Sequence, residues 1–290
     1  MNKKEFEKLA EEGFNHVPLV LECFADLDTP LSIYLKYANK PFSYLLESVQ
    51  GGEQFGRYSF VGLPSRIRYE VRGHTCVEIC DDAVVAQVER EDPIGWVSEL
   101  QQRTKAYYRD DLPRFLGGLV GYFGYETVHM IESRVGRGKS KSDPIDCPDI
   151  LLLHSEEVIV YDNLAGKLYF VVFANPQDTE AYELGQTRLT ELFAALRKPI
   201  DEPEEGAHEL AMPHEETPQD VFTESVARAK AYIHEGDIMQ VVLSQRMSVP
   251  FHAPPLSLYR SLRALNPSPY MFYFNLEDFH IVGASPEILV

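Results

Sequence analysis

The stretch Glu235-Gly-Asp-Ile-Met-Gln-Val-Val-Leu-Ser-Gln-Arg246 follows a segment of helical periodicity and is the most informative part of this chain. Its residues 239–243 are apolar and partly β-branched apart from Gln240, a composition typical of a buried strand. Side chains alternate faces along a strand, so Gln240 would share a face with Ile238 and Val242. A buried amide needs a hydrogen-bond partner. The pattern leaves two interpretations open: a core glutamine bonded to neighbouring backbone, or an amide that lines a ligand pocket.

The segments around this stretch predict further elements and a domain boundary. Thr217-Pro218 is a helix start signal, Gly236 is placed to end that helix, and apolar residues recur at helical spacing between them: Phe222, Val226, Ala229 and Ile233. Downstream we expect a helix over 256–265 and strands over 270–275 and 280–290. Residues 199–217 are acidic, contain proline and have little to bury, so they predict a linker. The expected domains are therefore 1–198 and 218–290.

The first of these domains reads as mixed helix and strand. Short apolar runs bounded by glycine and proline predict strands at 18–24, 42–49, 58–62, 67–72, 75–80, 150–154, 157–161 and 168–173. Helices are expected over 4–11, after Thr29-Pro30, from Asp92-Pro93 to about Ala106, and around 184–196. Turn residues between consecutive strands, as at 163–166, favour antiparallel hairpins. The predicted fold class is α+β, with antiparallel sheets flanked by helices.

Two further motifs bear on nucleotide or metal binding. The glycines of Phe115–Tyr125 match neither G-x-G-x-x-G nor a phosphate-binding loop, so close packing of strands beneath aromatic rings explains them better. His74, Cys76, Glu78 and Cys80 would share one face of a strand. At ~3.3 Å per residue the two cysteines would lie about 13 Å apart. One zinc ion holds its ligands within ~2.3 Å, so we expect no metal there.

Composition narrows the function classes. The chain has 290 residues and a formal net charge of −18, which argues against nonspecific binding to nucleic acid or to an anionic membrane. An anionic small molecule is still compatible with this charge, because a metal ion or local arginines can hold it. The four cysteines are too few and scattered for a disulfide framework. Without a signal peptide or a long apolar run, a cytoplasmic protein is expected.

Several motifs together resemble a known family. Residues 235–246, Asn266-Pro-Ser-Pro-Tyr-Met-Phe272 and Gly283-Ala-Ser-Pro-Glu-Ile-Leu289 are similar to the chorismate-utilising enzymes, most of all to anthranilate synthase component I. Residues 45–48, 56–60 and 117–122 resemble that family's N-terminal region. The family's chorismate-binding region continues beyond the equivalent of Val290, so the resemblance implies a C-terminally shortened chain that is inactive alone. Its Mg²⁺ ligands are expected beyond Val290, and no metal ligand is expected within this chain.

The resemblance implies a reaction and two catalytic residues. Ammonia would add to C2 of chorismate with loss of the C4 hydroxyl, and elimination of pyruvate would give anthranilate. Gln240 occupies the position of the lysine base in relatives that use water; ammonia already carries a lone pair, so a neutral amide can position it without acting as a base. Glu287 matches the general acid that protonates the departing hydroxyl. The residues alone also allow the interpretation that it is a surface carboxylate at a strand edge. Mg²⁺ would neutralise the substrate carboxylate, and a glutamine amidotransferase subunit, anthranilate synthase component II, would supply ammonia.

The resemblance also implies an inhibitor site for tryptophan. Its expected residues come from two distant motifs and one further arginine: Leu46, Glu47, Ser48, Arg57, Pro269, Tyr270 and Met271. Glu47 would accept the α-ammonium group and Ser48 would hydrogen-bond the ligand. Two alternatives stay open, aminodeoxychorismate synthase component I, which shares the glutamine, and a noncatalytic module that binds only tryptophan. Isochorismate synthase is disfavoured by Gln240 itself.

Overall fold

The computed structural model describes residues 1–49, 56–132, 134–135, 145–200 and 211–288. The chain forms two compact units, one of Met1–Glu202 with Leu258–Val290 and one of Pro203–Ser257. This division differs from the expected boundary at 218, because the C-terminal residues return to the first unit and add two strands to its sheet. The expected linker falls largely on residues 201–210, outside the described part.

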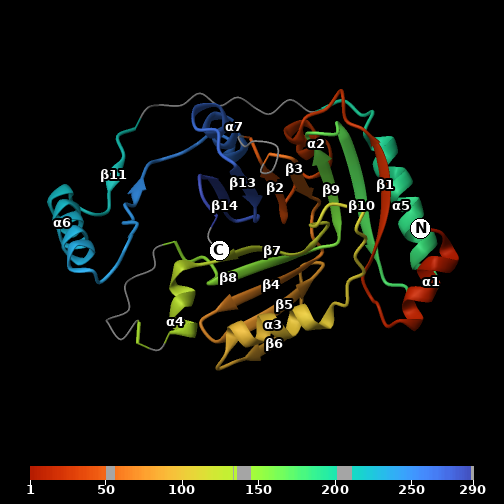
Figure 1. Ribbon diagram of the computed structural model, residues 1–290, viewed down its shortest axis with the longest axis horizontal. Helices are drawn as coiled ribbons and strands as arrows, with labels where there is room; N and C mark the ends of the chain where they lie inside the picture. The colour runs from red at the N-terminus through yellow and green to blue at the C-terminus, as the bar shows by residue number, and fades with distance from the viewer. Residues whose placement is uncertain (50–55, 133, 136–144, 201–210, 289–290) are drawn as a thin grey trace. The chain divides into compact units, whose positions relative to one another are not determined.

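The larger unit is built on two antiparallel sheets (Figure 1). The first has seven strands in the order β1-β10-β9-β3-β2-β13-β14. Their bounds are β1 Val17–Phe24, β2 Ser43–Glu47, β3 Tyr58–Gly62, β9 Glu157–Asp162, β10 Lys167–Ala174, β13 Tyr270–Asn275 and β14 His280–Ser285. The second has five strands in the order β6-β5-β4-β8-β7. Its bounds are β4 Ile67–Arg72, β5 Thr75–Cys80, β6 Ala83–Glu89, β7 Gly118–Phe123 and β8 Ile150–Ser155. The predicted fold class is confirmed.

Helices of the larger unit begin where the sequence places capping residues. Asn2, Thr29 and Asp92 each accept a backbone hydrogen bond at the start of α1 Lys3–Glu11, α2 Pro30–Tyr37 and α3 Pro93–Arg103. The remaining helical segments of this unit are η1 Tyr125–Thr127, α4 Val128–Ile131, α5 Ala181–Ala195 and α7 Pro255–Leu265, which belongs to the larger unit from Leu258 on. Helix α5 packs against β1 and β10, and α3 packs against β5. No helix of the described residues is both long and apolar enough to cross a membrane.

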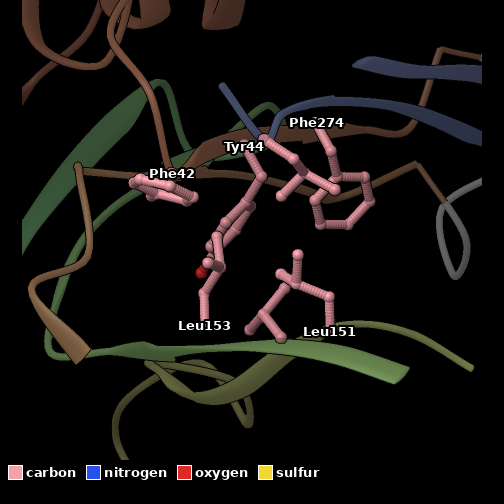
Figure 2. Close-up of a cluster of buried hydrophobic side chains, with 7 residues drawn as sticks. Phe42, Tyr44, Leu151, Leu153 and Phe274 are labelled. Carbon is pink, nitrogen blue, oxygen red and sulfur yellow. The ribbon is translucent and has the colours of Figure 1, made fainter. Parts of the chain in front are cut away.

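A hydrophobic cluster joins the two sheets (Figure 2). Tyr44 and Phe274 of the seven-stranded sheet pack with Leu151 and Leu153 of β8, and the Tyr44 hydroxyl shares a 2.8 Å hydrogen bond with Ser155. The Tyr44 ring lies directly over Gly62 on the neighbouring strand, where an added Cβ would come within 2.0 Å of the ring. A glycine is therefore required at this position. The sheets consequently form one body with a shared core.

The smaller unit contains little regular structure in its described residues. Helix α6 Gln219–Glu235 ends at Gly236 in the left-handed conformation, as the sequence predicts, with φ 85°. Two short strands, β11 His214–Glu215 and β12 Met247–Ser248, pair with each other. The predicted strand over 239–243 is wrong: these residues have no regular structure, and Met239 is 97% exposed. A strand needs a hydrogen-bonded neighbour, and none of the described strands pairs with this segment.

Candidate functional site

Strand pairing brings together the two motifs expected to bind tryptophan. Strands β2 and β13 are adjacent and antiparallel, with Glu47 opposite Met271 and Leu46 opposite Phe272. The contact continues beyond the strands, where the Val49 N–H donates to the Ser268 carbonyl at 3.2 Å. Residues far apart in the chain thus form one continuous pair of strands inside the sheet. The end of this pair that carries Glu47 and Met271 is the β2–β13 edge. Their role in ligand binding stays a prediction.

The Glu47 carboxylate is buried and already holds three hydrogen bonds. Its side chain is 3% exposed. Two bonds of 2.8 Å come from the Arg263 guanidinium and one of 2.8 Å from the Tyr259 hydroxyl. These bonds raise the pKa of Arg263, and burial together with the Glu47 charge raises the pKa of Tyr259. A ligand ammonium group would therefore have to share this carboxylate with Arg263.

Sequence reasoning missed Tyr259 and Arg263, although a signal for them exists. Both lie on α7, four residues apart, and so they face the same direction from the helix. An arginine and a tyrosine hydroxyl on one side of an amphipathic helix are able to donate hydrogen bonds to one anionic partner. The partner itself could not be identified from local sequence, because Glu47 lies more than two hundred positions earlier.

Ser268 ties the tryptophan motif to the strand that leads to Glu287. Its hydroxyl donates to the Ser285 carbonyl and accepts the Tyr270 N–H at 3.3 Å. Ser285 in turn donates from its hydroxyl to the Glu287 carbonyl at 2.7 Å. The start of β13 and the segment after β14 are therefore connected through buried Ser268.

Arg57, the remaining candidate for the inhibitor site, is engaged elsewhere. Its guanidinium bonds the Asp162 carboxylate at 2.8 and 3.1 Å and lies over the Tyr58 ring. The Asp162 side chain is fully buried and also accepts the N–H groups of Leu164 and Ala165 at the β9–β10 turn. In this structure Arg57 therefore stabilises that turn.

The two expected catalytic residues are both exposed and belong to different units. Gln240 lies in the irregular segment of the smaller unit. Glu287 follows β14 in the larger unit. Their expected meeting around a substrate stays a prediction.

The described residues do not fit Mg²⁺. Their one group of three metal-capable side chains within reach of one another is His16, His154 and Glu156. Magnesium prefers an octahedral shell of oxygen ligands, whereas two of these three side chains are imidazoles. We therefore derive no catalytic step through Mg²⁺ from this chain.

Comparison with known proteins agrees with the sequence motifs. Anthranilate synthase component 1 of Pseudomonas putida is 49% identical over 297 residues, which cover 100% of this chain and 60% of that protein. The Pseudomonas aeruginosa protein of the same name is 50% identical, with the same coverage. The crystal structure of anthranilate synthase component I from Streptococcus pneumoniae TIGR4 shares the fold, with a TM-score of 0.62, 24% identity, and coverage of 91% of this chain and 57% of that one.

This chain thus spans about three fifths of the length of these relatives. The family described as chorismate binding enzyme matches residues 44–290, which include β13, all of β2 except Ser43, and the expected catalytic positions. This chain belongs to the chorismate-binding enzyme family.

Proposed function

We propose that this chain forms part of an anthranilate synthase component 1, which converts chorismate and ammonia to anthranilate and pyruvate in tryptophan biosynthesis. The supporting observation is identity of 49–50% with two proteins of that name along the whole of this chain. Ammonia comes from glutamine through a glutamine amidotransferase partner, and the protein works in the cytoplasm. A Mg²⁺ ion, held by ligands other than the described residues of this chain, would supply neutralisation of the substrate carboxylate.

Gln240 and Glu287 have distinct roles in this proposal. The neutral amide of Gln240 positions ammonia, which needs no base to become a nucleophile. Glu287 donates the proton that lets the C4 hydroxyl leave as water. Its exposure after β14 agrees with a group that meets a substrate arriving from solvent.

The activity test combines this chain with the part of a relative that it does not cover. The chain is mixed with the part of the Pseudomonas putida protein that it does not cover, and with chorismate, ammonium and Mg²⁺, while anthranilate fluorescence is followed. We expect product from the mixture and none from the chain alone. Aminodeoxychorismate in place of anthranilate, or no product from the mixture, would overturn the proposal.

Variants in the same assay test the two roles. Glu287→Gln should lower the rate at least ~100-fold, the scale of lost general acid catalysis. Glu277→Gln, in the turn at the other end of the β13–β14 hairpin, is the matched control and should leave the rate unchanged. Gln240→Lys should reduce anthranilate and introduce a hydrated product, because the amine can now activate water. A Glu287→Gln variant as active as wild type removes the assigned role.

Feedback inhibition by tryptophan at the β2–β13 edge completes the proposal. Leu46, Glu47 and Ser48 face the motif Pro269-Tyr-Met271 across this edge, and the support is the pairing of Glu47 with Met271. Tryptophan is titrated by calorimetry into wild type, Ser48→Ala and Ser98→Ala, the last a serine of α3 outside this site. We expect Ser48→Ala alone to weaken binding about tenfold, the loss of one hydrogen bond. Equal binding by all three proteins would exclude the assigned pocket.

A further inference from the structure

Three metal-capable side chains from separate segments converge where the two sheets of the larger unit approach each other. His16 precedes β1, His154 lies in β8, and Glu156 follows β8. One ligand atom from each lies within 4.8 Å of the others. The two imidazole rings have centroids 5.4 Å apart. None of these residues belongs to the β2–β13 edge or to the expected catalytic positions.

His16 is held rigidly with a polar atom that lacks a partner. The residue is 7% exposed, and its Nε2 is buried without a hydrogen bond to any described residue. Its ring stacks on Phe173 at 3.9 Å between centroids, and its carbonyl accepts the Tyr107 N–H at 2.9 Å. A buried nitrogen without a partner costs stability. A phenylalanine would fill the same space without that cost, so packing alone does not account for an imidazole here.

The chemistry of the three side chains matches a zinc-class ion. Histidine binds a metal ion through its neutral imidazole, and the buried Nε2 of His16, unpaired among the described residues, is free to do so. Two imidazoles and one carboxylate are typical ligands of zinc and similar transition metals.

The geometry needs only a small adjustment to close around an ion. Ligand atoms bound at ~2.0–2.1 Å to a tetrahedral metal lie about 3.3 Å apart. The separations of up to 4.8 Å must therefore shrink by about 1.5 Å. Glu156 can supply this movement, because its carboxylate is half-buried and makes no hydrogen bond within the described part of the chain.

We propose that His16, His154 and Glu156 bind one zinc-class divalent ion, a site independent of the catalytic Mg²⁺. His154 and Glu156 also line a groove of about 760 Å³ beside α5, so a bound ion is reachable from solvent. Three protein ligands leave a fourth position for water or another ligand. The ion links the start of β1 to the β8–β9 connection and so fastens one sheet to the other.

The test is a calorimetric titration of the metal-free 290-residue chain, without a polyhistidine tag, with ZnCl₂. We expect one equivalent to bind, and His154→Phe and Glu156→Gln each to weaken binding at least about tenfold. His129→Phe, which removes a half-exposed histidine beside Glu126, is the matched control and should bind as wild type does. No binding, or equal binding by all variants, would overturn the proposal.

A second measurement keeps the test decisive if a ligand variant fails to fold, which circular dichroism detects. Co²⁺ replaces zinc in the wild-type chain, and its visible absorption is recorded. Intense bands of four-coordinate Co²⁺ are expected, with addition of zinc removing them. A spectrum identical to that of Co²⁺ in water shows that these side chains do not coordinate the ion and contradicts the proposal.

Discussion

Helices α5 and α6 have similar apolar stripes in sequence but lie in different surroundings. Helix α5 buries Gly185, Leu189 and Leu192, with Gly185 so close to β1 that an added Cβ would come within 2.4 Å of Leu19. Helix α6 has 17 residues and buries none of them, and Ile233 on its stripe is 42% exposed. The local pattern therefore determines that a helix forms, whereas a neighbouring sheet determines whether its stripe becomes core.

Strand β13 and the segment 239–243 differ in the same way. Both are apolar runs of similar length. Strand β13 lies between β2 and β14 and buries Met271, Tyr273 and Phe274. Segment 239–243 has no partner strand among the described residues, and Val242 is 85% exposed. An apolar run becomes a strand only where neighbours accept and donate its backbone hydrogen bonds.

The largest expected effect comes from removing the side chain at the centre of the larger unit. Tyr44→Ala deletes a fully buried ring from the cluster between the sheets, so we expect a loss of about 3–5 kcal/mol in the free energy of unfolding, measured in urea. Tyr232→Ala, on exposed α6, is the matched control and should cost less than ~0.5 kcal/mol. If both variants lose the same free energy of unfolding, the larger unit does not depend on its core more than α6 depends on its exposed side chains.

An intermediate effect is expected at the buried carboxylate of the β2–β13 edge. Glu47→Gln leaves Arg263 and Tyr259 beside a neutral amide, which can accept fewer of their hydrogen bonds. We expect a loss of about 1–3 kcal/mol in urea unfolding. Glu224→Gln on α6 is the control and should change nothing measurable. If Glu47→Gln leaves the free energy of unfolding unchanged, the stability of the β2–β13 edge does not depend on this charge.

The smallest effect is a dependence of stability on pH through Asp162. Burial alone would raise the pKa of this carboxyl, but Arg57 and two backbone N–H groups outweigh burial and hold the pKa below its ordinary value of 3.8. Near pH 4 the unfolded chain therefore binds more protons, so the stabilisation is present above pH 3.8 and is lost as pH falls through the lower, folded-state pKa.

Urea unfolding between about pH 5 and pH 3 measures this loss, and Asp162→Asn should reduce its slope. Asp220→Asn, on α6, is the control and should leave the slope of the larger unit's unfolding unchanged. An identical slope in Asp162→Asn would show that the ion pair with Arg57 is not linked to folding.

The regular elements could be predicted from sequence because their signals are local. Caps at Thr29 and Asp92, the turn at 163–166 and the short apolar runs of the first domain are sufficient to locate helices and strands. Strand β6 was not predicted, although Val84, Ala86 and Val88 alternate along it; every one of its side chains is exposed, so it forms by pairing with β5 and not by burying an apolar face.

The features that could not be predicted all depend on contacts between distant segments. Glu47 with Arg263 and His16 with His154 are pairs whose members lie on elements far apart in the chain. The return of residues 258–290 to the first unit likewise depends on β2 accepting β13 as a neighbour. The segment around Gln240 was misassigned because its composition indicates a strand, while no described strand pairs with it.

Hydrogen–deuterium exchange with and without tryptophan tests the central claim most directly. The claim is that the paired β2–β13 edge is ordered and forms the proposed tryptophan site, whereas the segment around Gln240 has no regular structure in this chain. We predict slow exchange at Leu45–Glu47 and Met271–Phe274, slower still with tryptophan, and fast exchange over 239–243 in both samples. Protection of 239–243 in the free chain, or tryptophan-dependent protection away from the edge, would contradict the account.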